Sequence, residues 1–94
     1  MLRRPDITNL STETASEIEV TLIDLDRVID LTGWHVDVFS NPLEPRIAVT
    51  VTAPDGRKSA EVFPFRIETP VSIRDFVAQE HECWRHRVAL KNSN

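Results

Sequence analysis

Three residues near the C-terminus carry side chains that can coordinate a metal ion or take part in thiol chemistry. Glu82, Cys83 and His86 are spaced so that a helix would turn them toward one face. One exposed helix cannot supply the full tetrahedral set of ligands that holds zinc firmly. We therefore interpret these residues as an ion pair between Glu82 and His86 beside a half-buried cysteine, and we expect no metal ion.

The same segment begins like a zinc-protease helix but departs from its motif. The HExxH motif places two histidines one turn apart, and here His81 and Glu82 are followed by Arg85 at the position of the second histidine. His86 comes one residue late and would lie about 140° around the helix from His81. With only two glycines, the chain also lacks a glycine-rich loop for phosphate. The sequence predicts no catalytic or cofactor-binding residues and no cofactor.

A second group of candidate residues is acidic. In a helix over 15–32, Asp26 and Asp30 would share one exposed face, where they could pair with a basic partner. The glycine-containing loop that binds calcium is missing. Near the C-terminus, tryptophan and arginine are residue types that dominate interface hot spots. The candidate protein interface consists of Asp24, Asp26, Asp30, Trp84, Arg85 and Arg87.

Length and composition limit what these residues can belong to. The 94 residues, 40% hydrophobic and 28% charged, suit one globular domain. No apolar run is long enough to cross a membrane or to form a signal peptide, and a single cysteine cannot form an internal disulfide. We expect a cytoplasmic protein that does not bind membranes. The net charge of −4 argues against a protein that coats nucleic acid.

Helical periodicity follows a polar N-terminal segment. Residues 1–13 show no periodicity and are expected to form a flexible arm. The segment Thr14–Glu17 matches a capping box, so we expect a helix over 15–32 with Gly33 as its C-terminal cap. A strand over 17–25 is the alternative, because β-branched residues are frequent there. The apolar stripe of the helix consists of Ile18, Leu22, Leu25 and Ile29.

Three strands are expected after this helix. Alternation of apolar and polar residues predicts strands over 34–38, 47–52 and 57–67. Two prolines make 41–45 a loop, and the Pro-Asp-Gly sequence makes 53–56 a tight turn. A proline within the third strand indicates a bulge or an edge strand. The core face is predicted to hold Trp34, Val36, Val38, Ile47, Val49 and Val51, and the polar face His35, Asp37, Thr50 and Thr52.

A second amphipathic helix completes the predicted fold. A capping box at Ser72–Asp75 precedes a helical pattern over 73–90, and 92–94 reads as a tail after a single domain over 14–91. The fold class is α+β. We expect a two-layer sandwich in the order α-β-β-β-α, in which a three-stranded antiparallel sheet carries both helices on one face.

This element order resembles that of the double-stranded-RNA-binding domain. The resemblance implies a lysine-rich start to the second helix that grips phosphates. Here the segment 72–79 has one arginine beside an aspartate. Since the resemblance rests on element order alone, it carries no function over to this chain.

The remaining function class is a non-enzymatic protein-protein interaction module. The acidic first helix and the Trp84–Arg87 cluster offer contacts to another protein, and the opposite charges of the two halves allow a homo-oligomer. By composition alone, small acidic proteins of this kind occur among phage and mobile-element inhibitors of host machinery, including anti-CRISPR proteins. The alternatives are a nucleic-acid-binding regulator using Arg85, Arg87 and Lys91, and a small enzyme or metal or thiol protein using Glu82, Cys83 and His86.

Overall fold

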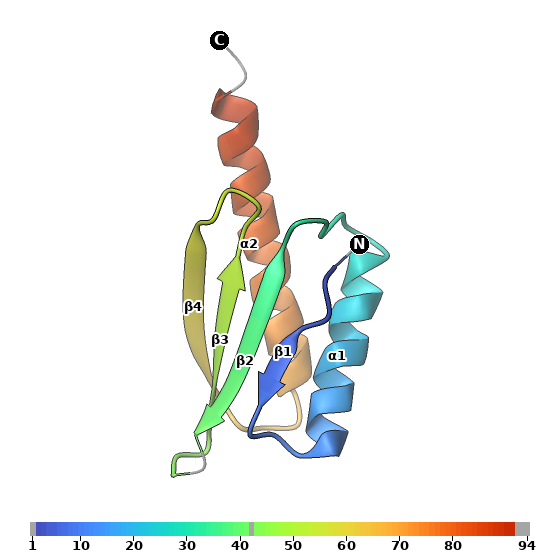
Figure 1. Cartoon of the computed structure of the whole chain (residues 1–94), viewed down its shortest axis with the longest axis vertical. Coiled ribbons are helices and arrows are strands. Elements are labelled where there is room, and N and C mark those ends of the chain that lie inside the picture. Colours follow the sequence, from blue (N-terminus) through green and yellow to red (C-terminus); the bar gives the residue numbers. More distant parts are fainter. Residues whose placement is uncertain (1, 42, 92–94) are drawn as a thin grey trace.

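The computed structural model describes residues 2–41 and 43–91, which form two helices and one four-stranded sheet (Figure 1). The fold is α+β, as predicted. None of the described helices has the length and apolar character needed to cross a bilayer. In chain order the elements are β1 (Asp6–Thr8), α1 (Thr12–Asp26), β2 (His35–Asn41), β3 (Arg46–Thr52), β4 (Lys58–Pro64) and α2 (Thr69–Lys91).

The sheet has one strand more than the sequence predicted, and it is mixed. The strand order is β1-β2-β3-β4, with β2, β3 and β4 antiparallel and β1 added parallel to β2. The extra strand lies in the segment that we expected to be a flexible arm. Three residues are too few to show a period-2 pattern, but Ile7 packs against the core and holds β1 in place. Asn9 then turns the chain toward α1 with a positive φ of 61°.

The first helix begins and ends earlier than expected. Ser11, rather than Thr14, is its N-cap, and the Ser11 hydroxyl accepts a hydrogen bond from the Thr14 backbone N–H at 3.2 Å. The helical assignment itself is confirmed over the strand alternative. The helix ends at Asp26, so Gly33 is not its cap; Gly33 instead has a positive φ of 85° in the loop before β2.

The central strands follow the predicted alternation. His35 pairs with Thr52 and Asp37 with Thr50 in the β2–β3 register, and these four residues lie on the outer, polar face. The turn at 53–56 is confirmed: the Gly56 N–H donates to the Ala53 carbonyl at 2.9 Å. The inner face of β2 and β3 holds the buried residues Val36, Val38, Ile47, Val49 and Val51. Trp34 is buried too, although it precedes β2.

The last strand is an edge strand without a bulge. Its register with β3 is continuous from Lys58 to Pro64, so the proline stands at the end of the ladder. The strand is therefore shorter than predicted, and Phe65 and Ile67 lie exposed in the connection to α2 rather than in the strand. In the loop between β2 and β3, Pro42 lies outside the described residues.

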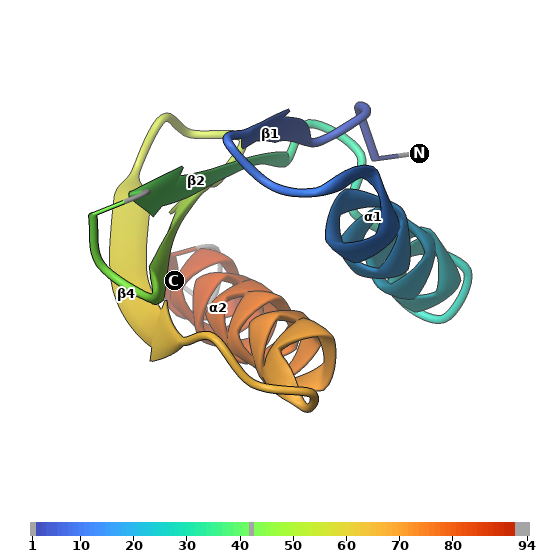
Figure 2. The same cartoon turned by 90° about the horizontal axis from the view of Figure 1, so that it is seen from below.

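The second helix starts at Thr69, one turn before the predicted capping box at Ser72. The buried Thr69 hydroxyl donates to the Pro64 carbonyl at 2.7 Å and accepts from the Arg66 N–H at 2.8 Å, which fixes the connection from β4. Ile73 and Val77 then bury against the sheet. Both helices cover the same face of the sheet, as predicted, and leave its other face without a helix (Figure 2).

Candidate functional site

The cluster predicted as the strongest metal or thiol candidate lies exposed on α2. His86 Nε2 lies 3.4 Å from Glu82 Oε1, and both side chains are more than half exposed. Cys83 is exposed and has a free thiol. The expected contact between Glu82 and His86 is therefore present, whereas Cys83 is exposed rather than half-buried as expected. Among residues 2–41 and 43–91, these three side chains do not converge into a group with metal-ligand spacing.

The three aspartates of the predicted interface occupy different environments. Asp24 is exposed and forms an ion pair with Arg27 at 3.4 Å. Asp26 is partly buried, and its carboxylate accepts hydrogen bonds from the backbone N–H groups of Leu2 at 2.9 Å and Leu31 at 3.3 Å. Because α1 ends at Asp26, Asp30 lies in the following loop, and the expected common helical face does not form.

Asp30 instead lines a hollow together with two of the candidate interface residues near the C-terminus. Asp30, Trp84 and Arg85 line this hollow, which has a volume of about 370 Å³. We call it the Trp84 hollow. Arg87 does not line it. The other lining residues are Val28, Ile29, Thr32, Trp34 and His81.

An aromatic cluster forms one wall of the Trp84 hollow. The Trp34 ring centroid lies 5.7 Å from both the His81 ring and the Trp84 ring, and the two tryptophans meet edge to face at 78°. Trp34 and His81 are buried, whereas Trp84 is only partly buried. Trp84 is thus a packing residue, because its ring connects α2 to the loop before β2.

The pKa of Asp30 allows the contribution of the loop after α1 to stability to be tested. The hydroxyl and the backbone N–H of Thr32 hold the pKa of Asp30 below its ordinary value of 3.8, with a smaller contribution from His81.

A carboxyl group whose pKa is lower in the folded than in the unfolded protein stabilises the fold at pH values above its unfolded-state pKa. This stabilisation is lost as the pH falls through the lowered pKa. We expect the difference in Tm between wild type and Asp30→Asn to shrink below about pH 4. Thermal denaturation from pH 7 to pH 3 measures it, and a constant or growing difference would contradict it.

A second recess lies between α1 and the start of α2. Residues of α1 and of the β4–α2 connection enclose two adjoining spaces of about 410 and 420 Å³ that share Glu17, Ile67 and Pro70. We call this the α1–α2 groove. Three apolar side chains at the groove are strongly exposed: Ile67 at 96%, Val20 at 55% and Phe65 at 52%. Its remaining lining residues are Thr14, Ser16, Thr21 and Arg66.

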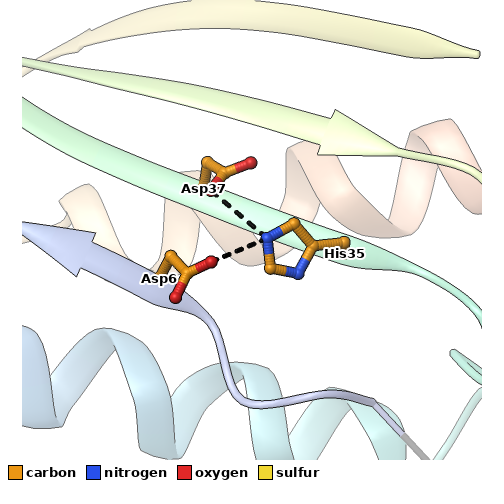
Figure 3. Close-up of side chains that lie close together, drawn as sticks. All are labelled: Asp6, His35 and Asp37. Carbon is orange, nitrogen blue, oxygen red and sulfur yellow. Dashed lines mark hydrogen bonds and ion pairs between the residues drawn. The ribbon is translucent and has the colours of Figure 1, made fainter.

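A third feature lies on the outer face of the sheet (Figure 3). His35 Nε2 lies 3.0 Å from Asp6 Oδ2 and 3.2 Å from Asp37 Oδ1. Asp6 comes from β1 and the other two residues from β2, where Asp6 and Asp37 are direct partners in the parallel register. These three residues are, among the described residues, the group whose ligand atoms all lie within 4.8 Å of one another.

Sequence analysis missed both of these latter features. His35 and Asp37 were placed correctly on the polar face, but Asp6 was assigned to the flexible arm, so the cluster could not be assembled. Phe65 and Ile67 fall within the last strand predicted over 57–67, which concealed the groove. Pro64 and the Thr69-Pro70 pair were the available signals that the strand would end early.

Comparison with known proteins adds no relative to these observations. No protein-family model matches the chain. No curated protein and no solved structure matches it either. The three surfaces are therefore interpreted from their own contacts, burial and charges.

Proposed function

We propose that this protein is a non-enzymatic protein-protein interaction module that binds a basic, amphipathic segment of its partner in the α1–α2 groove. The observation that carries the proposal is the exposure of Val20, Phe65 and Ile67 around one recess. Isolated apolar residues on a surface are ordinary, but apolar residues gathered at a groove are typical of binding sites. The groove also offers room for side chains that a flat surface lacks.

The charge of α1 specifies the partner. The helix carries no lysine or arginine within Thr12–Asp26, and Glu17 lines the groove. A partner with lysine or arginine beside its apolar anchors would complement the negative electrostatic field of α1. This complementarity favours association with a basic partner and disfavours acidic competitors. Glu13 and Glu17 produce this field, because Glu19 and Asp24 form ion pairs with Arg4 and Arg27, and Asp26 binds two backbone N–H groups.

Such a module would act by occupying the surface of another protein. This is the mode of action of small inhibitors and regulators, including those of phages and mobile elements. No catalytic step is part of the proposal. The predicted interface is modified accordingly: the groove supplies the apolar anchors, and the acidic side chains of α1 supply the charge.

A substitution at Ile67 tests the groove directly. Ile67→Asp places a charge among the apolar anchors, and we expect partner affinity to fall roughly tenfold or more. Because Ile67 is 96% exposed, the fold should be unaffected. The measurement is an affinity capture from lysate of the source organism with tagged wild type and variant, followed by titration of the recovered partner.

Val28→Asp is the matched control. Val28 is 81% exposed and lines the Trp84 hollow rather than the groove. We expect this variant to capture the same partner as wild type. Loss of capture in Val28→Asp with retention in Ile67→Asp would contradict the proposal. Recovery of nucleic acid that is lost on changing Arg85 and Arg87 would contradict it as well, since the exposed basic end of α2 would then be the binding surface.

A further inference from the structure

The Asp6–His35–Asp37 cluster places two like charges in direct opposition. Asp6 and Asp37 are partners in the β1–β2 register and point to the same face of the sheet. Like charges at paired positions destabilise a sheet unless a positive group lies between them. The group between them is the imidazole of His35, which contacts both carboxylates through the same nitrogen, Nε2.

The Nε2 nitrogen of His35 faces two carboxylate oxygens, and a metal ion satisfies this arrangement better than a proton does. A single N–H on Nε2 can point at only one oxygen at a time, whereas an ion accepts electron pairs from all three atoms at once. The donor set is also mixed rather than purely acidic. Imidazole nitrogen with two carboxylate oxygens is a combination that suits zinc and neighbouring transition metals.

The distances fit an ion without rearrangement of the strands. Ligand atoms lie about 2.1 Å from zinc, so neighbouring ligands in a tetrahedral or octahedral site are about 3.0–3.4 Å apart. The separations of His35 Nε2 from the Asp6 and Asp37 oxygens are 3.0 Å and 3.2 Å. All three ligand atoms lie within 4.8 Å of one another. Two of the three separations between ligand atoms therefore already match those of a coordination sphere.

We propose that Asp6, His35 and Asp37 bind a divalent transition-metal ion of the zinc class on the outer face of the sheet. The site is accessible to solvent, because no helix covers this face (Figure 2) and the Asp6 side chain is 70% exposed. Three protein ligands leave further coordination positions to water or to a ligand atom from another molecule. Since Asp6 lies on β1 and the other ligands on β2, a bound ion joins the two strands.

The surroundings of the second ring nitrogen of His35, Nδ1, determine the metal affinity that we expect. Nδ1 is buried and has no hydrogen-bond partner among residues 2–41 and 43–91. Histidines that bind metals usually donate this second N–H to an acceptor, and loss of such a partner costs about 10–100-fold in affinity. We therefore expect affinity in the micromolar range, weaker than that of a structural zinc site.

Calorimetric titration of the full chain with ZnCl₂ tests the proposal. Wild type should bind one equivalent of Zn²⁺, with much weaker binding of Mg²⁺ and Ca²⁺, which prefer sites made of oxygen ligands alone. Asp6→Asn should lower Zn²⁺ affinity at least about tenfold. Zn²⁺ should raise the Tm of wild type and raise that of Asp6→Asn much less. Asp6 is suited to this test because its exposed side chain can be changed without disturbing the core.

The exposed cluster on α2 provides the matched controls. Cys83→Ser and His86→Gln each remove an exposed side chain with affinity for zinc and should leave the titration unchanged. His35→Gln should abolish binding, with circular dichroism confirming that the variant is folded. The proposal is overturned if wild type does not bind Zn²⁺ or if Asp6→Asn binds it as tightly as wild type. Loss of binding in Cys83→Ser or His86→Gln would overturn it too, because the ion would then belong to α2.

Discussion

Replacing Trp34 with alanine is expected to lower the free energy of unfolding by about 3–5 kcal/mol. Trp34 is 3% exposed, and its ring contacts the rings of His81 and Trp84 on α2. Alanine would leave a cavity between the α1–β2 loop and the second helix, where neighbouring side chains cannot collapse fully. For a domain whose total stability is about 5–15 kcal/mol, this is a large loss.

Urea denaturation followed by circular dichroism measures the effect of Trp34→Ala. The midpoint should fall while the slope of the transition changes little. Val28→Ala is the control in the same loop, because Val28 is 81% exposed and its truncation should change stability by less than about 0.5 kcal/mol. A loss of less than about 1 kcal/mol in Trp34→Ala would show that the aromatic cluster is not a structural link between loop and helix.

Asp26→Ala is the second substitution with a large expected effect, a loss of about 2–3 kcal/mol. The Asp26 carboxylate binds the backbone N–H groups of Leu2 and Leu31, so it holds both the segment before β1 and the loop after α1. Hydrogen bonds to a charged group contribute about 1.5–3 kcal/mol each, and Leu31 is fully buried. Alanine would leave its N–H without a partner. The measurement is equilibrium unfolding combined with amide hydrogen exchange at Leu31.

Asp24→Ala is the matched control for Asp26→Ala. Asp24 is two residues away on the same helix, but it is exposed and its partner Arg27 is exposed as well. Exposed ion pairs of this kind contribute about 0–1 kcal/mol. Equal losses in the two variants, or unchanged exchange at Leu31, would contradict the anchoring role of Asp26. The comparison also shows which aspartate can be changed in a binding experiment without loss of folded protein.

The groove and the metal cluster share no residue and can be tested independently. The groove belongs to the helix layer, and the Asp6–His35–Asp37 cluster belongs to the outer face of the sheet. Ile67→Asp should therefore leave Zn²⁺ binding unchanged. Asp6→Asn should in turn leave the apolar anchors of the groove in place. Failure of one proposal carries no consequence for the other.

The parts of the fold that rest on local sequence patterns could be predicted before the structure was known. Alternation along β2 and β3 predicted their buried and polar faces, and the Pro-Asp-Gly turn predicted their connection to β4. The spacing of Ile18 and Leu22 predicted α1 and its buried stripe. These predictions were correct because a residue's face depends only on the period of its own helix or strand.

Contacts between residues far apart in the chain could not be predicted in this way. β1 has three residues and pairs in parallel with a strand far along the chain, so no local period marks it, and the position of Asp6 beside His35 could not be predicted. The end of α1 was misplaced because it depends on the Asp26 carboxylate accepting the Leu31 N–H. Side-chain hydrogen bonds and nonlocal strand pairing can override local secondary-structure propensity. Where they do, a prediction from the sequence pattern alone misassigns the helix or strand. Both candidate sites therefore became visible only when these contacts were known.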